Sequence, residues 1–264
     1  MTGGVPAIAA LPMYDWPELR RETDRWWDRL RESLLDSGFP APRHLDRANP
    51  AEILWRDERL LLAQSCGLPF VTELAGKVSL IGTPAYDIEC GAGSYYSVIV
   101  VRADSRLQSL DHVGGARLAY NNRHSQSGYA ALAHALAERP VRPKPFDSSV
   151  PTGSHRASIR AVADGRADIA AIDAVTWQIA LRHEEVTDRL RILALTDPTP
   201  GLPFVCANRP DWHADHIHMA VVEAMAALDE DCRQKLHLAG FAHTMASDYD
   251  VIRERHERTK NTAL

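Results

Sequence analysis

A run of small polar residues follows a short apolar segment near the middle of the chain. Residues 116–120 are typical of a strand, and Ser125, Ser127 and Gly128 then open an Ala-rich stretch typical of a helix. The first N–H groups of a helix have no partner inside it, so an anion can accept hydrogen bonds from them, and serine hydroxyls add neutral donors. Gly128 would let a ligand approach the backbone. The segment predicts an anion-binding turn, with a plain serine N-cap as the structural alternative.

A second segment repeats this arrangement further along the chain. Gly153, Ser154 and His155 precede another helical stretch, and His155 could donate to an anionic oxygen or simply cap the helix. Asp173 follows a buried apolar strand, at the carboxyl end where open α/β sheets place their ligands. Its carboxylate could accept from a ligand hydroxyl, amine or protonated phosphate oxygen, or it could cap the next helix. The two segments could therefore face one pocket.

Strands and helices alternate along the chain, and this alternation positions both segments. The run 95–101 is the clearest strand, because β-branched and aromatic residues fill it. The alternation predicts the α/β class with largely parallel sheets. We predict strands over 7–13, 60–63, 77–82, 95–101, 116–120, 168–172 and 190–195, and helices over 16–35, 67–74, 127–137, 154–163, 175–183, 217–228, 232–238 and 249–259.

Composition excludes several classes of protein. The 264 residues carry a formal net charge of −5, so there is no basic stripe for nucleic acid, and no run is apolar enough to insert into a membrane. The four cysteines, Cys66, Cys90, Cys206 and Cys232, are far apart and are expected to be reduced, mostly buried thiols. Residues 1–10 lack the basic region of a signal peptide, which indicates a cytoplasmic protein as written, or a periplasmic one if a signal was removed.

Motifs of common enzymes are missing from the sequence. Ser127 lies in SQSGY rather than GxSxG, and neither GxGxxG nor GxxxxGK[ST] occurs. His213, His216 and His218 could hold a metal, but an exposed helix start explains them as well. We therefore predict no catalytic residue, no metal and no cofactor.

The two segments together resemble the phosphate, phosphite and phosphonate binding proteins of ABC transporters. The motifs are SQSGY at 125–129 and GSHRASIRAVADGRADIAAID at 153–173, and the resemblance runs from about residue 11 to residue 207. It implies a two-lobed type II periplasmic-binding-protein fold with hinge crossovers and a ligand cleft between the lobes. Lobe I would comprise residues 1–94 and 200–264, and lobe II residues 95–199.

The resemblance also implies a site and a function. In that family the two turns bind the oxyanion from one lobe, and aromatic residues of the other lobe close over it; here Tyr14 and either Tyr95 or Tyr96 are at matching places. The chain is then a non-catalytic solute-binding protein for phosphate or a phosphonate-like compound, serving ABC-type uptake or sensing, with an ABC permease as partner. The predicted ligand-binding set is Tyr14, Tyr95, Ser125, Ser127, Gly128, Ser154, His155 and Asp173.

An enzyme built on the same scaffold is the alternative, since the pyrimidine-precursor synthases resemble these binding proteins. Such an enzyme would be intracellular and would need a reactive side chain in its cleft. Cys66 and Cys90 are the candidates, although core thiols are the simpler interpretation.

Overall fold

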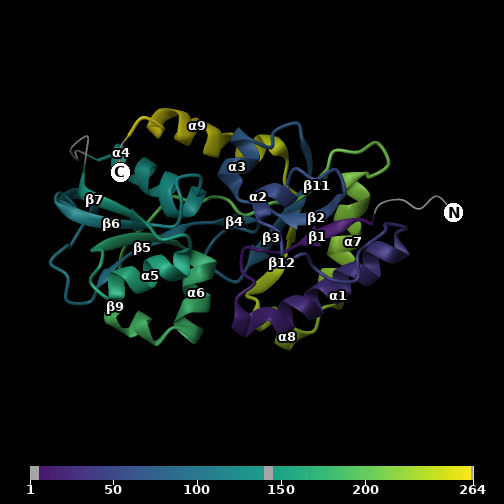
Figure 1. The fold of residues 1–264 in the computed structure, drawn as a ribbon, viewed down its shortest axis with the longest axis horizontal. Helices are drawn as coiled ribbons and strands as arrows, with labels where there is room; N and C mark the ends of the chain where they lie inside the picture. The colour runs from purple at the N-terminus through teal and green to yellow at the C-terminus, as the bar shows by residue number, and fades with distance from the viewer. Residues whose placement is uncertain (1–5, 140–144, 263) are drawn as a thin grey trace. The chain divides into compact units, whose positions relative to one another are not determined.

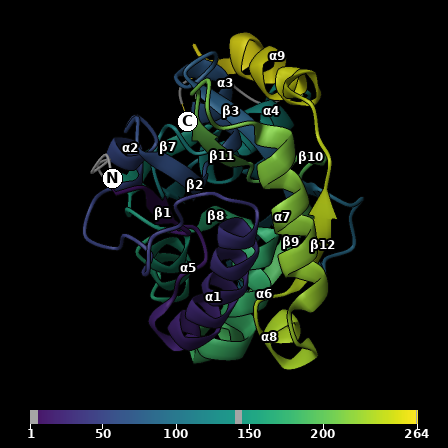
Figure 2. The ribbon, with the colours of Figure 1, turned by 90° about the vertical axis from the view of Figure 1, so that its right-hand side faces the viewer.

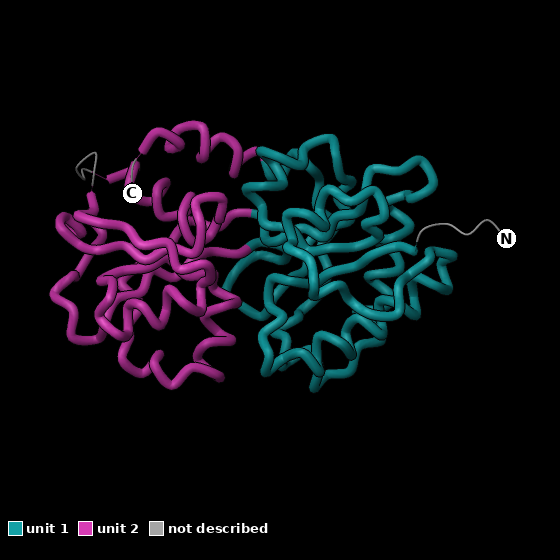
Figure 3. Tube along the Cα trace, in the orientation of Figure 1, with its two compact units in different colours: residues 1–94, 200–249 teal, residues 95–199, 250–264 magenta. Residues whose placement is uncertain are grey.

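The computed structural model describes residues 6–139, 145–262 and 264, and they form two compact units (Figure 3). The first unit comprises residues 1–94 and 200–249, and the second comprises residues 95–199 and 250–264. Residues 1–5, half of the stretch considered as a signal segment, lie outside the described part of the chain. Among the described residues, no helix has both the length and the hydropathy to cross a membrane.

The first unit is built on a five-stranded mixed sheet. Its most apolar strand, of sequence LLLAQ, is buried along its whole length and pairs in parallel with the first strand of the chain. The strand order is β1 (Ile8–Ala10), β2 (Leu60–Gln64), β11 (Phe204–Ala207), β3 (Val78–Tyr86) and β12 (Leu238–Ala242). β11 runs antiparallel to both β2 and β3, and β12 runs antiparallel to β3.

Helix α1 (Arg20–Asp36) supplies much of the first unit's core. Trp26, Trp27, Leu30 and Leu34 recur at helical spacing and are all buried. α1 packs against α7 (Ala214–Ala227), and the two helices lie side by side in Figure 2. The remaining helices of this unit are η1 (Pro17–Leu19), α2 (Ala51–Leu54), α3 (Gly67–Thr72), α8 (Glu230–Lys235) and η5 (Ala246–Tyr249).

The second unit has its own five-stranded sheet. The strand order is β7 (Phe146–Pro151), β6 (Ala116–Tyr120), β8 (Ile169–Asp173), β5 (Ser97–Arg102) and β9 (Leu190–Leu195). β6 runs parallel to both β7 and β8, whereas β5 runs antiparallel to β8 and β9. β4 (Ser94–Tyr95) and β10 (Thr199–Pro200) pair separately, where the chain passes from one unit to the other.

The prediction of largely parallel sheets is wrong, because both sheets are mixed. In each unit the first strand after a passage from the other unit, β5 or β11, runs antiparallel to its neighbours. Such a strand is not the return strand of a βαβ unit, so the rule that makes sequential strands parallel does not apply to it.

Helices cover both faces of the second sheet, with α5 and α6 on one face and α4 and α9 on the other (Figure 1). The core between them includes Ile99, Leu118, Leu132 and Ile169, which are fully buried. The helical elements are η2 (Leu110–His112), η3 (Gln126–Ala130), α4 (Ala131–Ala137), α5 (His155–Ala163), α6 (Ala174–His183), η4 (Glu185–Arg189) and α9 (Asp250–Thr259).

The end of the chain departs from the sequence analysis in two ways. The helix expected over 232–238 ends at Lys235, and β12 begins at Leu238. Residues 250–264, expected in lobe I, instead belong to the second unit, where α9 packs against α4 and η3.

Candidate functional site

The two segments that the sequence singled out lie together in the second unit. The Oγ atom of Ser127 is 2.8 Å from Nε2 of His155. Ser127 follows β6, His155 follows β7 and Asp173 ends β8, and these three neighbouring strands are parallel. Their carboxyl ends therefore share one edge of the sheet, the place where α/β proteins commonly bind ligands.

Ser125 begins the turn that carries Ser127. Its Oγ accepts hydrogen bonds from the Gly128 N–H at 3.0 Å and from Nδ2 of Asn121 at 2.9 Å, which leaves its own hydroxyl hydrogen to donate elsewhere. The N–H groups of Ala130 and Ala131 donate to the carbonyls of Ser125 and Gln126, five residues earlier, so η3 is a π-helical turn. Such single turns occur frequently at functional sites.

Gly128 is required here by packing. A Cβ atom at this position would lie 2.0 Å from Oδ1 of Asn121 and 3.0 Å from Cε1 of His155. The first distance is far inside van der Waals contact, so any side chain at 128 would displace the Asn121 amide. The glycine therefore keeps the serine turn, Asn121 and His155 in contact.

Two further residues support the turn and were not predicted from the sequence. The Asn121 carbonyl accepts the Gly153 N–H at 3.0 Å, so this residue connects the two segments, and its buried Oδ1 has no hydrogen-bond partner among the described residues. The Ser97 hydroxyl donates to the Ser127 carbonyl at 2.9 Å from β5. Asn121 could have been suspected, because an asparagine directly after a strand often bonds to the neighbouring loop. For Ser97 the sequence predicted only that it lies in a strand, and not that it contacts the serine turn.

His155 is neutral in the folded protein at neutral pH. Burial lowers its pKa from 6.5 to about 4, although the nearby Ala171 carbonyl favours the protonated form. Either His155 or Ser127 can donate across their contact, because the imidazole tautomer decides which one carries the hydrogen. The site thus offers neutral donors in place of a fixed cation.

The lowered pKa of His155 predicts a loss of stability in acid. Between pH 6.5 and about 4 the unfolded chain binds a proton at this residue that the folded chain does not, so the free energy of unfolding falls as the pH falls. We expect His155 to account for a loss of about 2 kcal/mol between about pH 7 and pH 5. Urea unfolding at both pH values should show this loss in the wild type and not in His155→Gln, while the exposed-residue control His216→Gln should retain it. An equal pH dependence in all three proteins would contradict the assignment.

Ser154 and Asp173 are helix caps in the structure. Oγ of Ser154 accepts the Ala157 N–H at 3.1 Å at the start of α5, and Oδ1 of Asp173 accepts the Thr176 N–H at 2.9 Å at the start of α6. Ser154 is exposed, whereas Asp173 is buried. Capping accounts for their positions, and their ligand-binding roles stay predictions.

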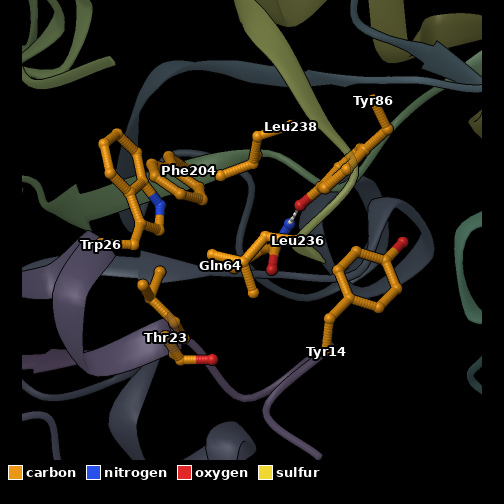
Figure 4. Close-up of a pocket in the computed structure, with 9 residues that line it drawn as sticks. Tyr14, Thr23, Trp26, Gln64, Tyr86, Phe204, Leu236 and Leu238 are labelled. Carbon is orange, nitrogen blue, oxygen red and sulfur yellow. Dashed lines mark hydrogen bonds between the residues drawn. The ribbon is translucent and has the colours of Figure 1, made fainter. Parts of the chain in front are cut away.

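Tyr14 and the Tyr95–Tyr96 pair belong to different units, and Tyr95 and Tyr96 share the second unit with the serine turn. Tyr14 belongs to the first unit, where its ring meets that of Tyr86 edge to face at 5.2 Å (Figure 4). Tyr95 is buried in β4, and Tyr96 is half-buried with its carbonyl accepting the Ala174 N–H at 3.0 Å. That one of these two tyrosines contacts the ligand stays a prediction.

Tyr14 lines a small, mainly apolar cavity of about 30 Å³ in the first unit. The one polar contact drawn in it is the hydrogen bond from Nε2 of Gln64 to the Tyr86 hydroxyl, at 2.9 Å (Figure 4). Its lining residues are Leu11, Tyr14, Thr23, Trp26, Gln64, Tyr86, Phe204, Leu236 and Leu238.

Three of the four thiols, those of Cys90, Cys206 and Cys232, do not have the environment of a reactive cysteine. All four are free; Cys206 and Cys232 are buried, and Cys66 and Cys90 are partly exposed. Burial raises the pKa of Cys90, and it raises the pKa of Cys206 to about 12 and that of Cys232 to about 11. An activated thiol needs the opposite shift.

The histidine cluster considered for a metal starts a helix. His213 precedes the first residue of α7, and Nδ1 of His218 is hydrogen-bonded to the Ile81 carbonyl at 2.9 Å. The cluster therefore lies at the start of a helix, which is the alternative that the sequence analysis gave for it.

Comparison with known proteins identifies relatives of the whole chain. Residues 8–249 match the model of a family described as the phosphonate periplasmic substrate-binding protein of ABC transporters. PhnD1 from Prochlorococcus marinus, solved in complex with methylphosphonate, is 18% identical with a TM-score of 0.75, covering 97% of this chain and 98% of its own. A binding protein of an ABC phosphonate transporter from Pseudomonas aeruginosa is 17% identical with a TM-score of 0.73, covering 98% and 88%.

A third solved structure, XAC2383 from Xanthomonas citri bound to ATP, is 16% identical with a TM-score of 0.72, and covers 98% of this chain and all of its own. A comparison with curated protein sequences finds no match. These likenesses confirm the predicted α/β, two-lobed type II fold of periplasmic binding proteins.

Proposed function

The chain belongs to the family of periplasmic phosphonate-binding proteins of ABC transporters, and from this premise we propose that it binds phosphate or a phosphonate through the serine turn of its second unit. Proteins of this family are non-catalytic substrate-binding proteins, so the chain is a binding protein rather than an enzyme. The alternative of an enzyme resembling the pyrimidine-precursor synthases has no support from these relatives.

The contact between Ser127 and His155 is the observation that carries the proposal. It brings together two turns that are distant in sequence, and each turn opens a helix at the carboxyl end of a parallel strand. A tetrahedral oxyanion placed beside this contact would meet the first N–H groups of two helices and the hydroxyls of Ser125 and Ser127. Helix N-termini favour anions through both their N–H donors and the helix dipole.

One basic residue beside the second turn is already engaged. Arg156 follows His155 directly, but its side chain is paired with Glu184, which also accepts two hydrogen bonds from Arg160 at 2.9 and 2.7 Å. The anion would therefore be held mainly by neutral donors. The methylphosphonate of PhnD1 and the ATP of XAC2383 both contain a tetrahedral phosphorus oxyanion, and this group is the ligand chemistry that we propose here.

A ligand screen tests the proposal. We expect methylphosphonate, an aminoalkylphosphonate, phosphite or phosphate to raise the melting temperature of the protein, and sulfate to do so less. A ligand present at about 100 times its Kd stabilises the folded state by about 2.7 kcal/mol, which a thermal-shift measurement detects easily. Titration calorimetry of the best ligand then gives the Kd. Stabilisation by none of the phosphorus compounds would contradict the proposal.

Transport is the physiological role that the family indicates. We propose that the protein delivers its ligand to an ABC permease and acts in the periplasm when it is exported. In a vesicle assay, the permease encoded nearest to its gene should take up the phosphonate only when this protein is added, and uptake without it would contradict the assignment.

A further inference from the structure

A histidine and two carboxylates converge in the second unit, away from the serine turn. Nε2 of His134 is 3.5 Å from Oε1 of Glu138, one helical turn further along. A carboxylate oxygen of Asp197, from the segment between β9 and β10, joins them, so that three ligand atoms lie within 4.8 Å of one another. Among the described residues, this is the one group of three His, Cys, Asp or Glu side chains whose ligand atoms lie close enough together to share a metal ion.

The cluster combines one buried side chain with two exposed ones. His134 is only 6% exposed, whereas the side chains of Glu138 and Asp197 are exposed and can move by the small distance that coordination requires. The residue before Asp197 is held to β5 by two hydrogen bonds. The Thr196 N–H donates to the Ser97 carbonyl at 2.9 Å, and the Thr196 Oγ1 accepts the Ser97 N–H at 2.9 Å.

The two carboxylates lack a basic partner of their own. Within the described part of the chain, neither Glu138 nor Asp197 forms an ion pair with an arginine or lysine side chain. Two negative charges this close repel each other unless a cation lies between them. The arrangement is therefore one that a bound cation would relieve.

Helix α9 places two positively charged side chains, Arg255 and Arg258, near this group. Nη1 of Arg255 is 3.3 Å from the Pro198 carbonyl and 3.5 Å from that of Asp197, so this side chain holds the segment by its backbone. Burial lowers the pKa of His134, and Arg255 and Arg258 lower it further against the influence of Glu138 and Asp197. Their positive charge reduces the attraction of this group for a cation.

We propose that His134, Glu138 and Asp197 bind a divalent transition-metal ion, with zinc as the best match to one imidazole and two carboxylates. Zinc bonds of about 2.0 to 2.2 Å place neighbouring ligand atoms about 3.4 Å apart, which the exposed carboxylates reach by a small shift. Water would complete the coordination. The ion would join the end of α4 to the segment before β10, and it would bind in the absence of any phosphonate.

Zinc titration of the chelator-treated protein tests the site without phosphonate present. We expect calorimetry to show one Zn²⁺ ion per chain and a higher melting temperature when it is bound. Asp197→Asn and Glu138→Gln each remove one ligand from an exposed position, and each should weaken zinc binding about tenfold or more. Co²⁺ in place of zinc should give the visible absorption of a low-symmetry site, which both variants should lose.

His216→Ala is the matched control, because His216 is exposed and belongs to the other histidine cluster. It should bind zinc as the wild type does. The proposal is overturned if the wild type binds no zinc, if Asp197→Asn binds it with unchanged affinity, or if the His216 variant is the one that loses it. Each measurement is independent of phosphonate binding, so its failure leaves the proposed function standing.

Discussion

Gly128→Ala should weaken phosphonate binding by about 5- to 150-fold, because the added methyl group would lie 2.0 Å from Oδ1 of Asn121. Overpacking of this kind typically costs about 1 to 3 kcal/mol, and here the displaced groups are those that shape the site. Moving Asn121 would disturb its hydrogen bond to Ser125, and moving His155 would disturb its contact with Ser127. Titration calorimetry with the best ligand of the screen measures the change in Kd.

Gly114→Ala is the control for this substitution. A Cβ atom at residue 114 meets nothing within 4 Å, and its backbone does not require glycine. This variant should bind with the affinity of the wild type. Equal affinity in Gly128→Ala would show that the ligand does not depend on the packing of the serine turn, and the proposed site would then be misplaced.

Replacing both Ser125 and Ser127 with alanine should have a still larger effect on binding. A hydrogen bond to a charged group is worth about 1.5 to 3 kcal/mol, so the pair could contribute roughly 3 to 6 kcal/mol. Neighbouring groups seldom add independently and water can replace a hydroxyl, so we expect about 3 kcal/mol, or roughly a hundredfold in Kd. Calorimetric titration of the double variant measures this loss directly.

The loss of the cap must be separated from the loss of binding. Ser125 caps η3, and its removal should lower the free energy of unfolding by about 1 kcal/mol. Urea unfolding of the double variant should therefore show a small decrease, in contrast to the large effect on Kd. Ser148→Ala with Ser149→Ala, in the edge strand β7, is a matched pair that should leave binding unchanged. A double variant of the serine turn with unchanged Kd would mean that the turn is only a helix cap.

Local sequence patterns predicted the strands and helices whose residues have a strong preference for that structure. The β-branched run 95–101 covers all of β5 except Arg102, and the serine before an Ala-rich stretch marks the start of η3. β7 was not predicted, because this edge strand of sequence FDSSVP is mostly exposed and has no apolar run. β12 was not predicted either, and its first residue, Leu238, was taken as the end of a helix, because a helical period and a short strand look alike over so few residues.

Local sequence patterns predicted some residues of the site but not the contacts between its segments. Ser127, Gly128 and His155 could be predicted because helix starts after strands have a recognisable composition. The contacts of Asn121 and Ser97 depend on how neighbouring loops pack, and no spacing along the chain encodes that. The π-helical form of η3 was equally invisible, since it differs from an α-helical turn only in its hydrogen bonds.

The position of β11 has a consequence for synthesis on the ribosome. This strand lies between β2 and β3, but it is made only after residues 95–199 have emerged. Until then the apolar β2 has one unpaired edge and β3 has two, since β12 is also made later, and such edges pair readily with other chains. The nascent first unit is thus incomplete for the time needed to translate about a hundred residues, roughly 5 to 20 s at ordinary rates. Any factor that shields strands during this interval should determine how much protein is recovered, and ligand affinity should not.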